Sequence, residues 1–231
     1  SSLYRGDGKG GFEEVARQSG LWRVTMTMGA NFGDLDNDGY LDFYLGTGYP
    51  FYDGLMPNLM YRNKAGKGFA DITTAGGFGH LQKGHGVAFG DIDNDGDQDV
   101  FEQMGGAFVG DAFGNVLFEN PGFGNHWIKV KLVGVESNKS GVGARIRVEF
   151  EEDGATRAVY RTVNTGGSFG CNPLTQHIGV GRATSIQSVE VFWPKTGETQ
   201  RFEDVAVDQR IRVTEDQDTF EVVAESRFAL R

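Results

Sequence analysis

A repeat of 57 residues fills the first half of the chain and constrains its fold more than any other feature. The segment GANFGDLDNDGYLDF at Gly29–Phe43 returns as GVAFGDIDNDGDQDV at Gly86–Val100. The same offset takes Tyr4 to Tyr61. A unit that recurs at a fixed period predicts a repeating architecture in which each unit packs against its neighbours.

Each unit of the repeat indicates short β-strands rather than helices. Segments such as LMYRN and GVAFGDI carry alternating or continuous apolar residues between Gly, Asn and Asp, and no stretch keeps a helical period. The sequence therefore predicts an all-β fold with propeller-type four-stranded blades, two complete and one partial that opens at 115–120. Because closed propellers usually have at least about four blades, the sequence favours a piece of a longer propeller. The alternative is that open blade edges pair with other chains.

The second half of the chain has a different composition. Residues 1–123 hold eight Lys and Arg against 17 Asp and Glu, whereas residues 124–231 hold 14 against 15. The run Pro121–Asn125 breaks the repeat, and strand signals separated by turns then continue. We predict blade repeats over 1–123, an antiparallel β-sandwich or barrel-like domain over 124–215, and a tail over 216–231. Two interpretations of the tail stay open: Thr219–Val223 forms one more strand, or the segment is loose.

The excess of acid in the first half is concentrated in two loops with identical spacing. Aspartates occupy positions 1, 3, 5 and 9 of each loop, and glycine occupies position 6. Carboxylates held this close repel one another, and a hard divalent cation removes that cost. Calcium accepts six to eight oxygen ligands in flexible geometry, with a backbone carbonyl at position 7. We therefore predict two Ca²⁺ sites, with the ligands Asp34, Asp36, Asp38, Tyr40 and Asp42 in the first and Asp91, Asp93, Asp95, Asp97 and Asp99 in the second.

Two other interpretations of these loops are weaker. A hairpin with solvated carboxylates does not require the same ligand positions in two copies. An EF-hand switch would need flanking helices and a Glu at position 12, where the first loop has Leu45 and only the second has Glu102. The loops are therefore predicted to bind calcium for architectural reasons.

Both halves resemble known modules. The motif F-G-D-x-D-x-D-G-x-x-D, which starts at Phe32 and again at Phe89, resembles the FG-GAP/VCBS repeats of integrin-α-type β-propellers. The motifs Gly141–Arg145, Gly179–Gly181 and Val191–Pro194 are similar to the ASPIC/UnbV domain that follows such repeats in the cartilage acidic protein family. The resemblance implies calcium in each acidic loop and a protein that is secreted, on the cell surface or periplasmic, with a role such as cell adhesion.

Composition narrows the classes of function. A net charge of −10 argues against nucleic acid, no apolar run is long enough to span a membrane, and one cysteine excludes an intrachain disulfide framework. We see no converging set of catalytic residues, so we expect a calcium-binding structural or interaction protein, not an enzyme, with an unidentified protein or glycan ligand. The alternatives are a carbohydrate-binding or carbohydrate-active propeller and a self-assembling protein, a homo-oligomer or filament, joined through open blade edges.

Overall fold

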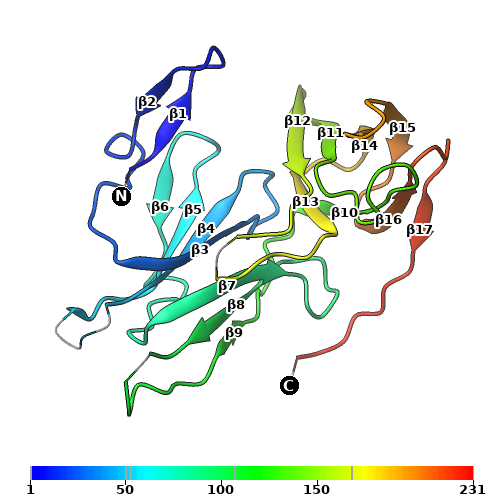
Figure 1. Ribbon diagram of the computed structural model, residues 1–231. Helices are drawn as coiled ribbons and strands as arrows, with labels where there is room; N and C mark the ends of the chain where they lie inside the picture. The colour runs from blue at the N-terminus through cyan, green and yellow to red at the C-terminus, as the bar shows by residue number, and fades with distance from the viewer. Residues whose placement is uncertain (1, 50, 52–53, 107, 168, 231) are drawn as a thin grey trace.

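The computed structural model confirms the all-β fold. It describes residues 2–49, 51, 54–106, 108–167 and 169–230, which form 17 strands and no α-helix. No helix long and apolar enough to cross a membrane occurs in these ranges. The two halves lie side by side, with the repeats in blue to green and the second half in green to red (Figure 1).

Three sheets make up the repeat half, and each is a meander of antiparallel strands. The first has two strands, the second four and the third three. Their bounds are β1 (Tyr4–Gly6), β2 (Phe12–Glu14), β3 (Thr27–Gly33), β4 (Asp42–Thr47), β5 (Leu59–Asn63), β6 (Phe69–Asp71), β7 (Gly84–Gly90), β8 (Asp99–Met104) and β9 (Val116–Phe118).

The sheets do not coincide with the sequence units. The 57-residue offset relates β1 and β2 to β5 and β6, which are the last two strands of the complete blade β3–β6. It also relates β7, β8 and β9 to β3, β4 and β5. The prediction of two complete blades and one partial blade is therefore replaced by one complete blade between a two-stranded and a three-stranded sheet.

The strand that would complete the third blade is used elsewhere. The offset carries β6 onto residues 126–128, which begin β10 (His126–Val133). These residues pair with β13 (Gln176–Gly181) and β16 (Gln209–Thr214) of the second half instead of β9. The end of the repeat is thus the point at which a blade strand becomes a sandwich strand.

The blades pack through their inner strands, β3 against β7 and β4 against β7. A Cβ atom on Gly29 would lie 1.6 Å from the carbonyl oxygen of His85, so only glycine permits this approach. Beneath it, Tyr44, Met60, Phe89 and Val100 form a buried apolar cluster. Close approach between blades is therefore one reason for the high glycine content of this half.

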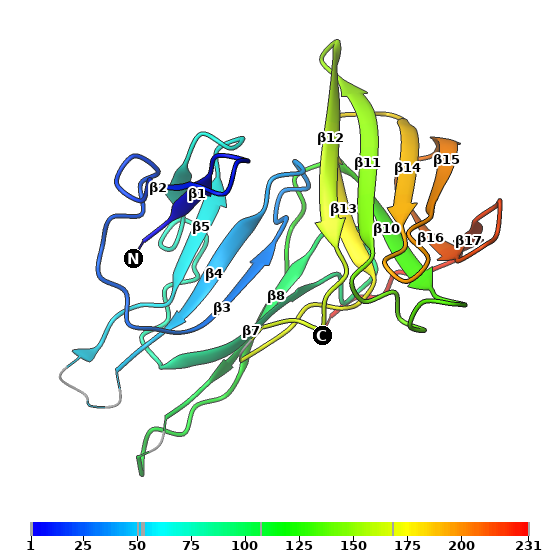
Figure 2. The same ribbon diagram turned by 45° about the horizontal axis from the view of Figure 1, so that its top comes forward.

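The second half is a β-sandwich of two four-stranded sheets (Figure 2), with orders β12-β11-β14-β15 and β13-β10-β16-β17. One large core lies between them and includes Ile128, Phe150, Ile178 and Trp193, each 0% exposed. The pair β10 and β16 is parallel, so the sandwich, which the sequence predicted to be antiparallel, is mixed at this pair. The remaining bounds are β11 (Arg145–Glu152), β12 (Ala155–Thr162), β13 (Gln176–Gly181), β14 (Ile186–Phe192), β15 (Thr199–Val205), β16 (Gln209–Thr214) and β17 (Glu221–Val223).

The tail supplies one more strand, the first of the two alternatives left open by the sequence, although it is shorter than Thr219–Val223. Strand β17 pairs with β16, and the chain then runs back toward the blades (Figures 1 and 2). The backbone N–H of Phe228 donates to the carbonyl of Asp93 at 3.0 Å. The tail therefore links the sandwich to the second acidic loop.

Candidate metal sites between the blades and the sandwich

The two acidic loops connect the first two strands of their sheets and have the same backbone conformation. Asn37 and Gly39 in the loop between β3 and β4 have positive φ angles, as do Asn94 and Gly96 between β7 and β8. In each loop the glycine N–H donates to the first aspartate, at 3.0 Å to Asp34 Oδ2 in the first and at 2.9 Å to Asp91 Oδ2 in the second. Asparagine and glycine tolerate this left-handed backbone, which curls the loop around its carboxylates.

The first loop gathers carboxylates in a buried environment. Oxygens of Asp34, Asp36 and Asp42 lie within 4.8 Å of one another. The Oδ1 atoms of Asp34 and Asp36 are buried and lack a hydrogen-bond partner among the described residues. Burial raises the pKa of Asp34 to about 7, despite the nearby Arg161, and that of Asp42 to about 8. A cation ligated here would remove a large desolvation cost.

Cations of the chain approach the second loop. Oxygens of Asp91, Asp93 and Asp95 lie within 4.8 Å of one another. The Lys129 ammonium lies 2.6 Å from Asp91, and the Arg227 guanidinium lies 2.9 Å from Asp95. In the first loop, Arg62 lies 2.9 Å from Asp36 and Arg161 lies 3.4 Å from Asp34, so two cations approach the carboxylates of each loop.

The predicted ligands outside these two clusters have other visible roles. Asp99 accepts backbone hydrogen bonds from Ile92 at 3.0 Å and Asn120 at 2.9 Å, and Asp38 accepts one from the N–H of Tyr40 at 2.8 Å. The Tyr40 ring lies 4.8 Å from the guanidinium carbon of Arg157.

Asp97 joins the two loops. Its Oδ1 accepts from the side chain of Asn37 at 3.0 Å, and the same amide donates to the carbonyl of Gly96 at 3.0 Å. Burial raises the pKa of Asp97 to about 6, and the neighbouring Asp95 and Asp91 add to the shift. The sites are therefore connected through Asn37, which the sequence motif places outside the ligand positions.

Sequence reasoning missed the contribution of the sandwich to both loops. Arg161 Nη2 lies 3.4 Å from Asp34, and Arg157 Nη2 donates to the carbonyl of Asp38 at 2.9 Å. The backbone N–H of Gly179 donates to Asp34 at 3.1 Å, and a Cβ there would lie 2.3 Å from the Asn37 backbone. The one sequence feature that pointed to such contacts is the excess of Asp and Glu over Lys and Arg in residues 1–123. It indicates that cations from outside the loops must help to neutralise the carboxylates.

A further buried carboxyl lies in the third blade, outside the predicted set. Glu102 is 0% exposed, and its Oε2 accepts from Tyr44 at 2.9 Å and Asn58 at 3.1 Å. Its Oε1 has no partner among the described residues. Burial raises the pKa of Glu102 to about 7, against the opposing effect of these two hydrogen bonds. A buried acid of this kind remains largely protonated in weakly acidic solution.

The residues of the two loops fit a hard cation. Their donors are carboxylate and carbonyl oxygens, which calcium prefers, and the two buried oxygens of the first loop lack partners within the described chain. Exposed acidic groups occur often without metal. Asp34, however, is fully buried, and an ion would satisfy an oxygen that the protein leaves unpaired.

Comparison with protein families agrees with the two resemblances. The model of the FG-GAP-like repeat matches residues 1–45, which include the whole first loop. The model of the ASPIC and UnbV domain matches residues 134–220 within the sandwich. A search of curated proteins gave no match, so the similarity to cartilage acidic proteins stays a prediction. The chain therefore contains an FG-GAP-like repeat in its blade half, followed by an ASPIC and UnbV domain.

Proposed function

We propose that this chain is an extracellular calcium-binding interaction protein, in which one ion in each acidic loop fixes the surface that the blades present to a ligand. The observation that carries the proposal is the pair of buried, unpartnered oxygens on Asp34 and Asp36. FG-GAP-like repeats support the extracellular location, secreted, on a cell surface or periplasmic. The proposed role is binding rather than catalysis, with a protein or glycan as ligand.

Calcium in these loops would have a structural role. It would neutralise the clustered carboxylates, which include Asp34 and Asp36 in the first loop and Asp91 and Asp93 in the second. The cations of the sandwich would then hold the loops from the other side, since Arg161 and Lys129 already face them. Each ion would therefore both order its own loop and support the docking of the blades against the sandwich.

Asp93→Ala is expected to abolish one of the two calcium sites and to leave the loop of Asp34 titratable. Asp93 provides a carboxylate to the second cluster, and alanine removes both the charge and the oxygen ligand. Isothermal titration calorimetry should give two ions for the wild type and one for the variant. The exposed Asp218 provides a matched control, since Asp218→Ala should retain both ions. Two ions in the Asp93 variant would show that the ligand assignment is wrong.

The incomplete sheets favour a second proposal, self-association through blade edges. Strand β9 pairs only with β8 among the described strands, and unpaired N–H and C=O groups of an edge favour the addition of a strand. Tyr4, Phe12 and Leu117, on the edge strands β1, β2 and β9, are exposed.

We expect light scattering in calcium at micromolar concentration to show dimers, rings or fibres. The physical reason is that a contact between two different edges produces rings or open filaments, according to whether the rotation closes. A single species at the monomer mass of 25.2 kDa would contradict this proposal and would leave the calcium proposal intact.

A further inference from the structure

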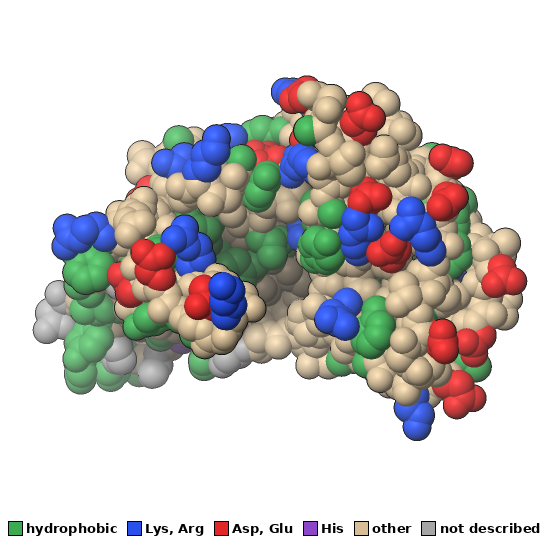
Figure 3. All heavy atoms as spheres, turned by 90° about the horizontal axis from the view of Figure 1, so that it is seen from above, with side chains coloured by type: hydrophobic (Ala, Val, Ile, Leu, Met, Phe, Trp, Pro, Cys, Tyr) green, Lys and Arg blue, Asp and Glu red, His purple; other side chains and the backbone are tan. Residues whose placement is uncertain are grey.

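A cavity of about 720 Å³ lies where the blades meet the sandwich. Strand β3 and the end of β7 line it on one side, and β12 and β13 line it on the other. Viewed from above, the molecular surface is hollowed between the two halves (Figure 3). A volume of this size is typical of sites for small ligands or short oligomers.

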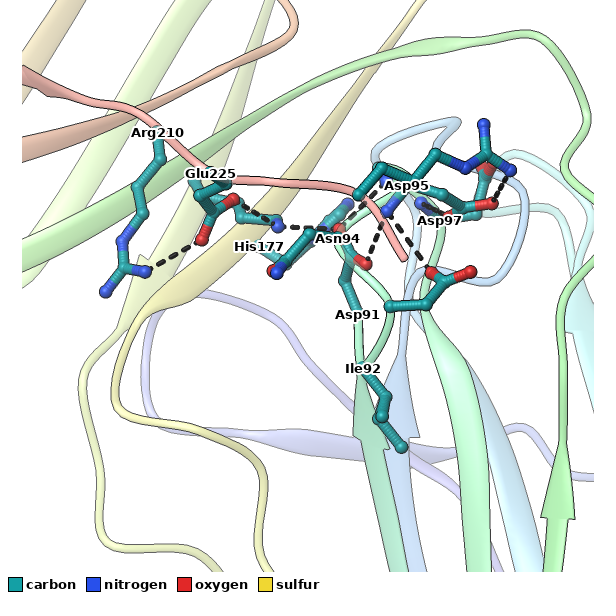
Figure 4. Close-up of polar contacts among 12 residues, drawn as sticks. Asp91, Ile92, Asn94, Asp95, Asp97, His177, Arg210 and Glu225 are labelled. Carbon is teal, nitrogen blue, oxygen red and sulfur yellow. Dashed lines mark hydrogen bonds and ion pairs between the residues drawn. The ribbon is translucent and has the colours of Figure 1, made fainter. Parts of the chain in front are cut away.

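The lining is cationic although the protein is strongly acidic. Lys129, Arg161 and Arg210 line the cavity against the acids Asp91 and Glu225, in a chain whose net charge is −10. The Lys129 ammonium lies 2.6 Å from both acids, and Arg210 donates to Glu225 at 2.7 Å (Figure 4). These contacts satisfy both carboxylates and leave the lining with an excess of positive charge.

Arg161 is the most loosely paired cation of the lining. Lys129 and Arg210 each lie within 2.7 Å of an acid oxygen. The nearest acid oxygen to Arg161 within ion-pair range is 3.4 Å away, on Asp34. Arginine forms its strongest pairs with carboxylates at shorter range, so the cavity retains capacity to bind an anionic group.

The neutral part of the lining is suited to a polyhydroxylated molecule. Gln176, Thr162 and Thr175 line the cavity with an amide and two hydroxyls. The amides of Asn31 and Asn164, which also line it, already form hydrogen bonds within the chain. Phe32 is 51% exposed and Tyr160 is 65% exposed, although both line the cavity. Planar amides and hydroxyls pair with sugar hydroxyls, and an exposed aromatic ring offers an apolar face for a pyranose.

We propose that this cavity binds an acidic carbohydrate, a sugar of the uronate class, with its carboxylate toward Arg210 and Arg161 and its ring near Tyr160. The proposal goes beyond calcium binding by the loops, because none of these three residues belongs to the loops. Positive charge selects the carboxylate, and the amides and aromatic rings select the sugar over a simple anion.

Calorimetric titration of the full calcium-loaded chain tests the proposal. The probes are α-1,4-digalacturonate and the neutral α-1,4-galactobiose, which differ only in their carboxylates, at a fixed free calcium concentration. Digalacturonate is expected to bind at least about tenfold more tightly, since one charge-assisted hydrogen bond contributes a factor of this order. Arg210→Gln should weaken digalacturonate binding by at least about tenfold.

Arg212→Gln is the matched control, because Arg212 lies on the same strand and pairs with the tail residue Glu221 at 2.7 Å but does not line the cavity. Tyr160→Ala, at the exposed rim, should also weaken binding and covers the case in which the Arg210 variant fails to fold. The proposal is overturned by equal binding of the two disaccharides, equal losses in the Arg210 and Arg212 variants, or no binding at millimolar concentration. Tighter binding of a polyglutamate peptide would assign the cavity to an acidic peptide instead.

Discussion

Thermal unfolding in millimolar calcium is expected to occur about 10 to 20 °C above unfolding in a chelator. A ligand that binds only the folded state stabilises by about 2.7 kcal/mol at a hundredfold excess over its Kd. Two sites would double this value, and each kcal/mol shifts Tm by about 2–4 °C for a chain of this size. The gain arises in part because the buried oxygens of Asp34 and Asp36 acquire a partner.

Scanning calorimetry or circular dichroism can measure the shift. Magnesium serves as the control ion, because it retains its waters and should stabilise less than calcium at equal concentration. The exposed-site variant Asp218→Ala should show the full shift in calcium. Superimposable melting curves in calcium and chelator would contradict the proposed function.

Glu102→Gln is expected to flatten the dependence of stability on pH. Folding raises the pKa of Glu102 from 4.5 to about 7, so the native state binds more protons than the unfolded state between these values. The stability linked to this proton is fully present below about pH 4.5 and is lost as pH rises through about 7. At 1.36 kcal/mol for each pKa unit, the loss is about 3 kcal/mol by pH 8.

Denaturant unfolding at pH 5 and pH 8, in saturating calcium, measures the effect. The wild type should lose about 2.5 kcal/mol more than the Gln variant between these two pH values, because part of the loss precedes pH 5. Glu119, an exposed residue after β9 in the same blade, provides the control, and Glu119→Gln should keep the wild-type profile. Equal profiles for the wild type and the Glu102 variant would mean that Glu102 is already ionised in the native state.

The repeat predicted the strands of the blade half well because its landmarks recur at one offset. The first two aspartates of each loop converge as the motif requires, since Asn37 and Gly39 fix the backbone. Local sequence carried no information on which strand would leave the third blade. That outcome depends on β10 pairing with β13 and β16, whose sequences lie about 50 and 80 residues away.

The surroundings of the loops could not be predicted for the same reason. The contacts of Arg161 and Lys129 with the aspartates join residues from different halves, and nothing in their local sequence marks them as partners of an acidic loop. The local sequence pattern therefore predicted where the acidic loops lie and which carboxylates they carry. Long-range packing determined which carboxylates are buried, which are neutralised, and where the cavity lies.

The position of the first loop beneath the sandwich has a consequence for the rate of ion exchange. Asp34 is 0% exposed, and Gly39 and Gly179 bring the two halves into backbone contact above it. An ion held there could leave only when the halves separate locally, so exchange would occur at the frequency of that opening. We expect release from the loop of Asp34 to be slow and independent of chelator concentration. Calcium would therefore enter this loop, as well as leave it, only at the rate of that opening.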